Sequence, residues 1–558
     1  MFSFLTCWLG LTLGALIRLG YGLLYNRDVA FQAGTAITLL VLLATGRVTY
    51  ALVLYPKYFT PFKHLPTPPH RWLLTGNETS LFREFPWDVA RRWSETIPNN
   101  GLIRYYVALS NERLLVTSPK GLSEVLVHGA YDYTKTNLAR FAIQRFTGNG
   151  LGFLDGEEHR IQKRGLLPPF ATGHIKRLIP KFWAKAALMV SLIERSLEDQ
   201  RQKSSSPVVP LHHWGTRATL DIIGVVGMGY DFDTLTHPHN ELSEQYRKMF
   251  LEPSNAFNWL ELLGNYIDFR ILLTLPVRKN RELTQGSQYI RQVAERVIHH
   301  KIQKQQQQQQ QQRQSEERPP DDDIVAMALA SGTFTEKQLV DHVMTFLVAG
   351  HESTATAFEW AMYELGRRPA MQSRLREEIR THISSMQVEG RGEATTAAGT
   401  HLATTIESLP YLNAVCSEAL RYYPFVPFAT RVASRDNTIQ GTFVPKGTVV
   451  AFAAHATNHD AALWGPDADR FDPERWMRPQ QGKSGGATSN FASLTFSAGP
   501  KSCIGQGWTR AELACLVGAT VGRFEIALID PMDNHLKRGK TMKLKNGVHA
   551  RVRVQDGW

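Results

Sequence analysis

The N-terminal part of the chain carries two runs of apolar residues. The first run spans Phe2–Ile17, and the second spans Val29–Gly46 with Val48–Tyr55 continuing it. A membrane-spanning helix needs about 20 apolar residues, so the second run is long enough and the first is marginal. A cleaved signal peptide is an alternative for the first run, but its sequence has no basic start and no clear small-residue cleavage site. Residues 1–55 are therefore predicted to form a membrane anchor of one or two transmembrane helices.

The stretch after the second run is basic and rich in proline. Lys57, Lys63, His64 and Arg71 follow the apolar residues, and basic residues mark the cytoplasmic side of a membrane helix. The N-terminus is cytoplasmic if both runs span and luminal if only the second spans, and the sequence leaves both arrangements open. Proline resists helix formation, so residues 56–71 are predicted to form a stiff hinge before a domain that covers residues 72–558.

Beyond the hinge, apolar positions recur mostly with a helical period. Two short alternating stretches, Leu102–Leu109 and Arg113–Thr117, are predicted to be paired strands. The predicted helices cover residues 155–164, 174–200, 213–229, 239–251 and 281–304, a run that begins at Thr335-Glu336, and a run from Trp508 to Phe524. The predicted fold class is mostly α-helical with small β-sheets.

Two segments of low complexity interrupt this pattern, near residues 303–323 and 385–406. The first contains an unbroken glutamine run, Gln305 to Gln312, which is predicted to be a mobile loop or an extension of the preceding helix. The second is rich in Gly, Ala, Thr and Ser and is predicted to be a disordered insertion. Neither segment carries chemistry that we can identify.

Composition narrows the class of protein. The four cysteines, Cys7, Cys416, Cys503 and Cys515, show neither a zinc-type spacing nor a disulfide framework, which fits a reducing compartment. The net charge of +12 would suit nucleic acid, but the sequence has no compact basic stripe with interleaved aromatic residues. We therefore expect no nucleic-acid partner, and a basic face toward anionic lipid or an acidic electron donor instead.

The stretch with the most specific chemistry runs from Phe496 to Gly505 and reads FSAGPKSCIG. Cys503 precedes a helical run, and a helix N-terminus is expected to lower the pKa of a thiol and favour the thiolate, which is the form that ligates metal. The glycines allow the backbone to pass close to a bulky group. Taken alone, a cysteine in such a loop would more commonly be a buried free thiol.

This stretch resembles the cysteine loop of the cytochromes P450, which reads F-x-x-G-x-R-x-C-x-G. Phe496, Gly499, Cys503 and Gly505 match, and Lys501 stands where the family usually has Arg. The resemblance covers nearly the whole chain after about Leu65. It implies a cytochrome P450 fold behind the membrane anchor, with haem b as cofactor and the Cys503 thiolate as axial ligand that favours O–O cleavage.

A second resemblance lies in the predicted helix that begins at Thr335. Its residues 349–354 read AGHEST, similar to the family's (A/G)-G-x-(D/E)-T-(T/S) motif, which lies over the haem. Glycine inside a helix costs about 1 kcal/mol relative to alanine, so Gly350 indicates a close approach, either of another helix or of a ligand beside Ala349 and Gly350. The resemblance implies that Glu352 and a hydroxyl relay protons to dioxygen. Ser353 occupies the usual hydroxyl position, and Thr354, its neighbour, is the alternative.

Glu418 and Arg421 stand three residues apart on one predicted helix face. Alone, such a pair would be a surface ion pair worth less than about 1 kcal/mol. The resemblance instead places both in a buried cluster with Arg475, beneath the cysteine loop, where the planar guanidinium suits a carboxylate.

Further residues acquire roles only through the resemblance. His159 and Lys163 take the positions of a Trp-x-x-x-Arg pair that holds a haem propionate, with Arg164 a competitor for Lys163. The residues expected to contact the propionates are His159, Lys163, Arg431 and Lys501. The residues expected to face the substrate are Phe346, Phe425, Val426 and Phe428.

Together these features imply a monooxygenase that inserts one atom of O2 into an apolar organic substrate. The resemblance is to fungal microsomal members, many of which tailor terpenoids, polyketides or alkaloids. The sequence has no flavin or nicotinamide fingerprint after a strand, so electrons are expected from NADPH through a separate cytochrome P450 reductase, with cytochrome b5 as a further donor. The expected location is the endoplasmic reticulum membrane, with the catalytic domain facing the cytoplasm.

Two other classes of protein stay open on the sequence. The first is a haem-thiolate isomerase or dehydratase that needs no reductase, against which the residues Glu352-Ser353-Thr354 argue. The second is a membrane-anchored haem carrier or sensor without turnover, against which the oxygen motif and the predicted ion cluster argue. The substrate, the position of oxidation, the pathway and the oligomeric state are not specified by the sequence.

Overall fold

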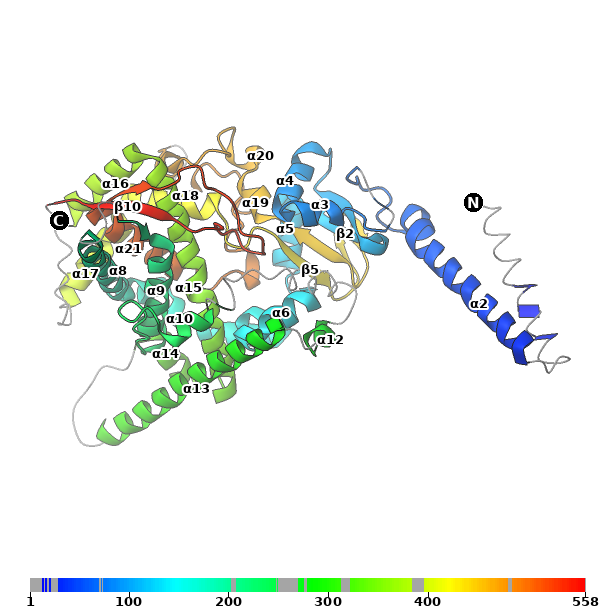
Figure 1. Cartoon of the computed structure of the whole chain (residues 1–558), viewed down its shortest axis with the longest axis horizontal. Coiled ribbons are helices and arrows are strands. Elements are labelled where there is room, and N and C mark those ends of the chain that lie inside the picture. Colours follow the sequence, from blue (N-terminus) through cyan, green and yellow to red (C-terminus); the bar gives the residue numbers. More distant parts are fainter. Residues whose placement is uncertain are drawn as a thin grey trace. The chain divides into compact units, whose positions relative to one another are not determined.

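The structure is a computed structural model of the whole chain (Figure 1). It describes residues 13–14, 16–17, 20–21, 29–69, 72, 74–201, 207–246, 248, 269–274, 278–312, 322–383, 396–479, 484–556 and 558. These residues are mostly helical with small sheets, which confirms the predicted fold class. The chain divides into two compact units: Met1–Gly121 with Ala433–Phe452, and Leu122–Val432 with Ala453–Trp558.

The elements follow one another along the chain with short connections. From the N-terminus to the middle they are α2 (Val29–Thr49), η1 (Tyr50–Phe59), α3 (Glu78–Arg83), α4 (Pro86–Thr96), β1 (Leu102–Val107), η2 (Ala108–Ser110), β2 (Asn111–Val116), α5 (Pro119–Ser123), η3 (Glu124–His128), β3 (Tyr133–Thr134), α6 (Asn137–Thr147), η4 (Leu151–Phe153), α7 (Gly156–Leu166), η5 (Pro168–Phe170), α8 (Thr172–Arg201), β4 (Val209–Pro210), α9 (Leu211–Ile222), η6 (Ile223–Met228), α10 (Glu241–Tyr246), α12 (Phe269–Thr274) and α13 (Arg278–Gln312). The remaining elements are α14 (Ile324–Ala330), α15 (Glu336–Arg367), α16 (Pro369–His382), α17 (Thr396–Ser408), α18 (Pro410–Tyr422), β5 (Ala429–Ala433), β6 (Asn437–Ile439), β7 (Thr442–Val444), β8 (Val449–Phe452), α19 (Ala454–Asn458), α20 (Ala461–Trp464), η8 (Pro473–Trp476), η10 (Gly499–Lys501), α21 (Gln506–Arg523), β9 (Phe524–Leu528) and β10 (His549–Val554).

The first unit begins with a long apolar helix. Within α2 and the π-helix η1, the segment Ala33–Phe59 is long and apolar enough to cross a membrane, and almost none of its most apolar part is buried against protein. Leucine and valine on its surface, such as Leu40 and Val41, are more than half exposed. The earlier apolar run, Phe2–Ile17, lies almost entirely outside the described residues, so the choice between one and two spans stays a prediction.

The strands of the first unit are antiparallel or parallel according to their connections. β1 pairs with β2 in antiparallel fashion, with Leu102 opposite Val116, which confirms the predicted strand pair. β2 also pairs in parallel with β8, and β6 forms a hairpin with β7.

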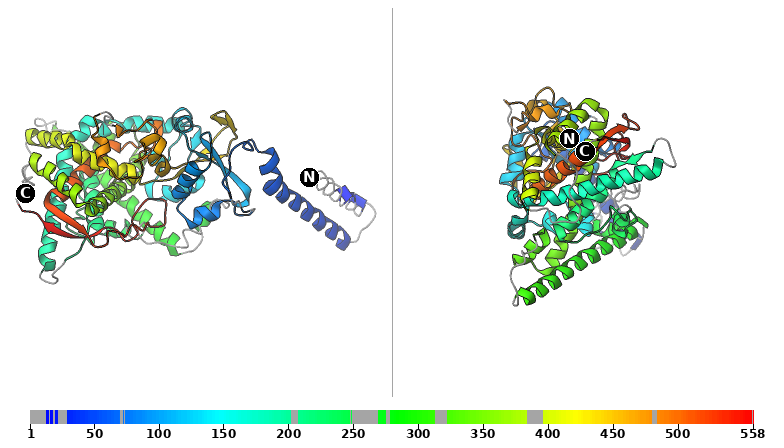
Figure 2. Two further views of the ribbon diagram at one scale, coloured as in Figure 1. Left: turned by 90° about the horizontal axis from the view of Figure 1, so that it is seen from above. Right: turned by 90° about the vertical axis from the view of Figure 1, so that its left-hand side faces the viewer.

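The second unit is a bundle of helices around α15 (Figure 1). α15 packs against α9, α21, α13 and α6, and the long helices α8 and α13 are seen in Figure 2 at full length. The start of α15 follows from its sequence: the Thr335 hydroxyl accepts from the Gln338 N–H, and the Gln338 side chain accepts from the Thr335 N–H at 2.9 Å. This capping box satisfies backbone donors at the helix N-terminus. Apolar side chains from both faces of α15 are buried, so it is the core helix of this unit.

Both low-complexity segments contain helix. The glutamine run continues α13 as far as Gln312, which is the second of the two predicted alternatives. In the other segment, residues 396–408 form α17, so the prediction of a disordered insertion is wrong for residues 396–406. The physical reason is that α17 packs on α8 and buries Ala403 and Ile406 completely, although its composition is polar. The rest of both segments lies outside the described residues.

A small sheet closes the C-terminal part of the second unit. β10 lies between β4 and β9 in antiparallel register, with Ala550 opposite both Val209 and Leu528. The loop between β9 and β10 is held to the helical bundle by Met542. Its backbone N–H donates to the carbonyl of Phe425 at 3.1 Å, and its carbonyl accepts from the Trp360 indole of α15 at 2.9 Å.

Candidate active site

The loop that carries Cys503 is tightly folded between η10 and α21. The Cys503 N–H donates to the Phe496 carbonyl at 2.9 Å, which closes the turn. Gly499 has φ +70°, and a Cβ there would lie 2.2 Å from the Leu126 carbonyl oxygen. Both the left-handed backbone and the close approach therefore require glycine at this position.

The side chain of Cys503 differs from those of the other described cysteines. Cys503 is exposed, whereas Cys416 and Cys515 are buried, and Cys7 lies outside the described residues. Burial raises the pKa of the Cys416 thiol to about 12 and that of Cys515 still further. Cys503 is thus the one thiol of these three that is open to a ligand.

The predicted lowering of the pKa of Cys503 is wrong for the protein without a ligand. Desolvation by the surrounding protein raises the pKa of Cys503, although the Gly505 N–H and the Lys163 ammonium act to lower it. The helix-terminal effect expected from the sequence is present, but burial outweighs it. A bound cation would be needed to complete the stabilisation of a thiolate here.

One face of α15 is left open beside a helix that is otherwise buried. From Leu339 to Leu365 every residue is buried except Thr345 and a group at Val348, Ala349, Gly350, Glu352 and Ser353. Ala349 and Ser353 are one turn apart and so share a face. Gly350 points elsewhere, because a Cβ there would lie 3.0 Å from Ile223 of η6. For Gly350 this geometry supports close helix packing, one of the two alternatives that the sequence left open.

The two candidate hydroxyls lie on different sides of α15. Ser353 is half-buried and donates to the Ala349 carbonyl at 2.8 Å. Thr354 is completely buried, and its hydroxyl lies beside the Glu512 carboxyl of α21. Burial raises the pKa of Glu512 well above its ordinary value, against the opposing effects of Thr354 and of the Trp508 indole, which donates to it at 3.0 Å. Thr354 therefore faces a neutral carboxyl inside the bundle.

Glu352 is held by a cation from outside its helix. The Lys543 ammonium, in the loop between β9 and β10, forms an ion pair with the Glu352 carboxylate, and both side chains are mostly buried. Burial alone would raise the pKa of Glu352, but Lys543 and His351 outweigh it and hold the pKa below its ordinary value. Glu352 is consequently a carboxylate at neutral pH.

Four cationic side chains share a single carboxylate near the start of α7. Asp155, which precedes α7, forms ion pairs with Arg140 and Lys501. Lys135 and Arg431 complete this group, which we call the cation group. Burial lowers the pKa of Lys135 to about 7, with further lowering by its cationic neighbours and only partial compensation by Asp155. Burial likewise lowers the pKa of Arg431. The cation group has an excess of positive charge that suits a dianionic ligand.

His159 and Lys163 lie beside the cation group with different partners. His159 is buried, its Nδ1 is 3.1 Å from the Tyr131 hydroxyl, and burial together with Lys163 and Lys501 lowers its pKa to about 4. His159 is therefore a neutral hydrogen-bonding group. Lys163 donates to the carbonyls of Pro500 and Ser502, at 2.7 and 3.2 Å. Arg164, the alternative to Lys163, is exposed on the other side of α7.

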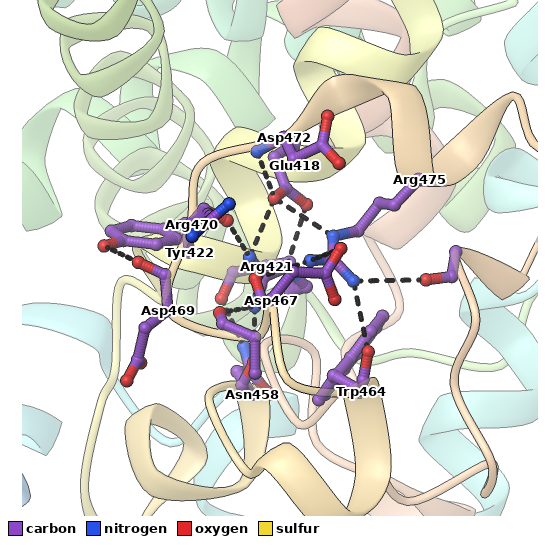
Figure 3. Close-up of polar contacts among 12 residues, drawn as sticks. Glu418, Arg421, Tyr422, Asn458, Trp464, Asp467, Asp469, Arg470, Asp472 and Arg475 are labelled. Atoms are coloured by element: carbon purple, nitrogen blue, oxygen red, sulfur yellow. Dashed lines mark hydrogen bonds and ion pairs between the residues drawn. The ribbon is translucent and has the colours of Figure 1, made fainter.

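Beneath these elements lies a buried ion cluster (Figure 3). Arg421 donates to both oxygens of Glu418 at 2.7 and 2.8 Å, and Arg475 donates to Glu418 at 3.3 Å. All three side chains are fully buried. Arg421 also donates to the carbonyls of three residues outside its helix: Asn458, Ala468 and Arg470. The cluster ties α18 to the segment that leads to the cysteine loop.

The position of α18 is itself fixed by a neighbouring helix. Pro410 occupies its first turn, where a missing N–H costs nothing. The Glu378 carboxylate of α16 accepts from the N–H groups of Tyr411 and Leu412, both at 2.8 Å. An anion at a helix N-terminus is favourable, so α16 holds the start of α18.

The candidate substrate residues are not alike. Phe346 is buried on α15 between Phe170 and His342, with ring centroids 5.8 and 6.1 Å away. Phe425 and Phe428 are half-buried, and Val426 is 46% exposed. Phe425 is also the residue whose carbonyl anchors the loop that carries Lys543.

Sequence reasoning missed several members of this site, namely Lys135, Arg140, Asp155, Lys543 and Glu512. The basic spacing from Lys135 to Arg145 and the isolated Asp155 before a helix are signals for the first three. Nothing near Lys543 or Glu512 marks them, because their partners on α15 are far away in sequence.

Comparison with known proteins gives concordant results. The family model described as Cytochrome P450 matches residues 66–549. The chain is similar to the cytochrome P450 monooxygenase FSL4 of Gibberella zeae, 56% identical over 520 residues that cover 91% of each chain. It is 41% identical to the cytochrome P450 monooxygenase sphH of Aspergillus fumigatus over 96% of each chain. It is 36% identical to the cytochrome P450 monooxygenase FUM15 of Gibberella moniliformis over 90% of each chain.

Proposed function

The chain belongs to the cytochrome P450 family and is a monooxygenase, and we propose that it oxidises an apolar organic intermediate of a fungal secondary metabolite. The reaction inserts one atom of O2 by hydroxylation, epoxidation or successive oxidations. The substrate is a terpenoid, polyketide or alkaloid. The observation that carries the proposal is the exposed Cys503 thiol in a loop with the family's residues, within a family match over residues 66–549.

The described residues fit a haem, which the family implies. Cys503 offers an exposed sulphur, and Ala349 and Ser353 offer a face of small side chains. The cation group has an excess of positive charge, which two propionates would neutralise. When bound, haem supplies the iron chemistry that activates dioxygen. We propose that Cys503 ligates the iron and that the propionates are held by Lys501, Arg431, His159 and Lys163 together with Lys135 and Arg140.

The remaining side chains prepare the site around that group. Glu352 stands at the open face of α15 and supplies protons, and Ser353 is the hydroxyl that receives them, because Thr354 faces Glu512 instead. Phe346, Phe425, Val426 and Phe428 supply apolar contacts to the substrate. Glu418, Arg421 and Arg475 keep the segment before the cysteine loop in place and take no part in the chemistry.

We further propose that electrons come from NADPH through a separate cytochrome P450 reductase, with cytochrome b5 as a possible second donor. The helix Ala33–Phe59 anchors the protein in the endoplasmic reticulum membrane, and the catalytic part faces the cytoplasm, where the basic residues Lys57 and Lys63 also lie.

The test is expression of the full chain with a fungal reductase in a host fed candidate terpenoids, polyketides and alkaloids. Products are analysed by mass spectrometry after growth under ¹⁸O2. A product heavier by one labelled oxygen, absent from cells that carry Cys503→Ser, is the expected result. A product without the label points to an isomerase or dehydratase, and haem binding with no NADPH consumption points to a carrier.

A further inference from the structure

A second buried carboxyl lies on the same side of α15 as Glu352. Glu359 is seven residues further along the helix, which is close to two full turns and about 10 Å along the axis. It is 6% exposed. Burial raises the pKa of Glu359 to about 7, against the opposing effects of the Lys543 ammonium and the Val548 N–H. Glu359 therefore exchanges a proton near neutral pH, whereas Glu352 is a carboxylate.

Lys543 is the side chain shared by the two carboxyls. Its ammonium pairs with Glu352 and acts electrostatically on Glu359. Its position is fixed because Met542, the preceding residue, is buried and bonded to both Trp360 and Phe425. Trp360 adjoins Glu359 on α15, so the loop is attached beside the very residue that holds the second proton.

The far end of this arrangement reaches the surface through histidines. The Val548 N–H donates to Glu359, and the Val548 carbonyl lies 3.4 Å from His212 Nδ1. The His212 ring lies 4.1 Å from the ring of His213 and 5.2 Å from that of His549, and both of these residues are exposed. Burial lowers the pKa of His212 to about 3, so it is neutral and suited to pass a proton without storing one.

We propose that Glu359 is a proton reservoir that reloads Glu352 through Lys543, with His212 as the connection to solvent. The Lys543 ammonium gives a proton to the Glu352 carboxylate and takes one from the Glu359 acid. Glu352 passes its proton to the oxygen side of α15, and the Glu359 carboxylate regains one from solvent through His212. The net transfer is one proton inward with no movement of electrons. The role rests on the proposed function, because only a monooxygenase needs repeated protons at this face.

Other ionisable groups around this route are few. The Glu352 carboxylate is influenced by Lys543 and Lys537 from the loop, by His351 of its own helix, and itself raises the pKa of Tyr246 of α10, after the larger effect of burial. His212 is influenced by His213, His549 and Lys543. Among the described residues that shift the pKa of Glu359, Lys543 is the one charged group. A change of pH between 6 and 8 should therefore act on the route chiefly through Glu359.

The experiment compares the full-length holoprotein with Glu359→Gln, which keeps the shape but removes the acid, and with Glu359→Asp, which keeps an acid. Glu336→Gln is the matched control, because Glu336 lies at the exposed start of the same helix. The first readout is the infrared band of protonated carboxylic acids, measured from pH 5.5 to 8.5. The second is peroxide formed per NADPH with added reductase and no added substrate, measured over the same range.

In the wild type and in Glu336→Gln, an acid band should titrate near pH 7, and peroxide per NADPH should rise as Glu359 loses its proton. Glu359→Gln should lack that band and keep the high peroxide yield at every pH, about two- to tenfold above the wild type at pH 6. This is smaller than the ~10²–10⁴ that a directly acting acid contributes. Glu359→Asp should recover the pH dependence with a shifted midpoint.

The proposal is overturned if Glu359→Gln and the wild type share one pH profile of peroxide yield, or if Glu359→Asp behaves like Glu359→Gln. If none of the proteins consumes NADPH although the acid band titrates, the proposed function fails while the assignment of the titrating group to Glu359 stands.

Discussion

Arg421 binds Glu418 through two parallel hydrogen bonds, 2.7 and 2.8 Å long, and neither side chain is exposed to solvent. Three of the carbonyl groups that Arg421 also contacts belong to residues 458–470, outside its own helix. This one guanidinium therefore neutralises a buried carboxylate and joins separate segments of the chain.

Arg421→Ala should destabilise the protein by about 3–5 kcal/mol, because it leaves the Glu418 carboxylate buried with only Arg475 as partner. We expect little haem-loaded protein, measured as haem per polypeptide and by thermal unfolding. Arg470→Ala is the control, since the Arg470 side chain is exposed and its backbone carbonyl is kept. Normal haem content and stability in Arg421→Ala would show that the cluster is dispensable.

Lys501 is the member of the cation group that lies closest in sequence to Cys503. Lys501→Glu should lose haem, because it would add a second anion beside Asp155 and leave propionates repelled rather than bound. Lys501→Arg should be tolerated, because it keeps the charge. The measurement is the haem dissociation rate to a haem-scavenging protein. Arg164→Glu makes the same charge reversal at an exposed site of α7 and should leave that rate unchanged. Equal rates in Lys501→Glu and the wild type would remove Lys501 from the set.

Local sequence signals were sufficient for the parts of the fold that depend on nearby residues. The capping residues Thr335 and Gln338 and the apolar period after them define α15. The turn between Val107 and Asn111 likewise fixes the β1–β2 pair. For the site, the spacing of Glu418 and Arg421 indicated an ion pair, but its burial depends on residues 458–470, which only the folded chain brings close.

Other features were out of reach because they depend on burial. The pKa of Cys503 was expected to fall from its place before α21, yet desolvation raises it. The polar composition of residues 396–406 hid the apolar contacts of Ala403 and Ile406 with α8. Glu359 resembles any helical glutamate in the sequence, and its raised pKa arises from a fully packed environment.

Cys503→Ser should abolish the thiolate-type absorption band of the reduced carbon monoxide complex, because an alcohol does not replace a thiolate as the axial ligand. Cys416→Ser and Cys515→Ser are controls that remove the other two described thiols. Both are buried, so they should lower stability without changing the spectrum of the protein that folds. Survival of the band in Cys503→Ser would remove the central assignment.

Ser353 and Thr354 allow the two sides of α15 to be tested against each other. Adjacent helical residues point about 100° apart, and here Ser353 lies on the open face while Thr354 faces Glu512. Ser353→Ala should lower product per NADPH and raise peroxide severalfold with haem content unchanged, because the hydroxyl that receives protons from Glu352 is gone. Thr354→Ala should have a smaller effect on peroxide and act mainly on stability, since it leaves a small cavity beside a neutral carboxyl.

Ser353→Thr, which restores the residue usual in the family, should keep its coupling because the Ser353 side chain is only half-buried and one more methyl has room. The three variants are compared by NADPH consumed, peroxide formed and haem bound. The opposite order, with Thr354→Ala uncoupled and Ser353→Ala normal, would assign the hydroxyl to Thr354. It would also require α15 to rotate in the working enzyme, because Thr354 is completely enclosed in the present structure.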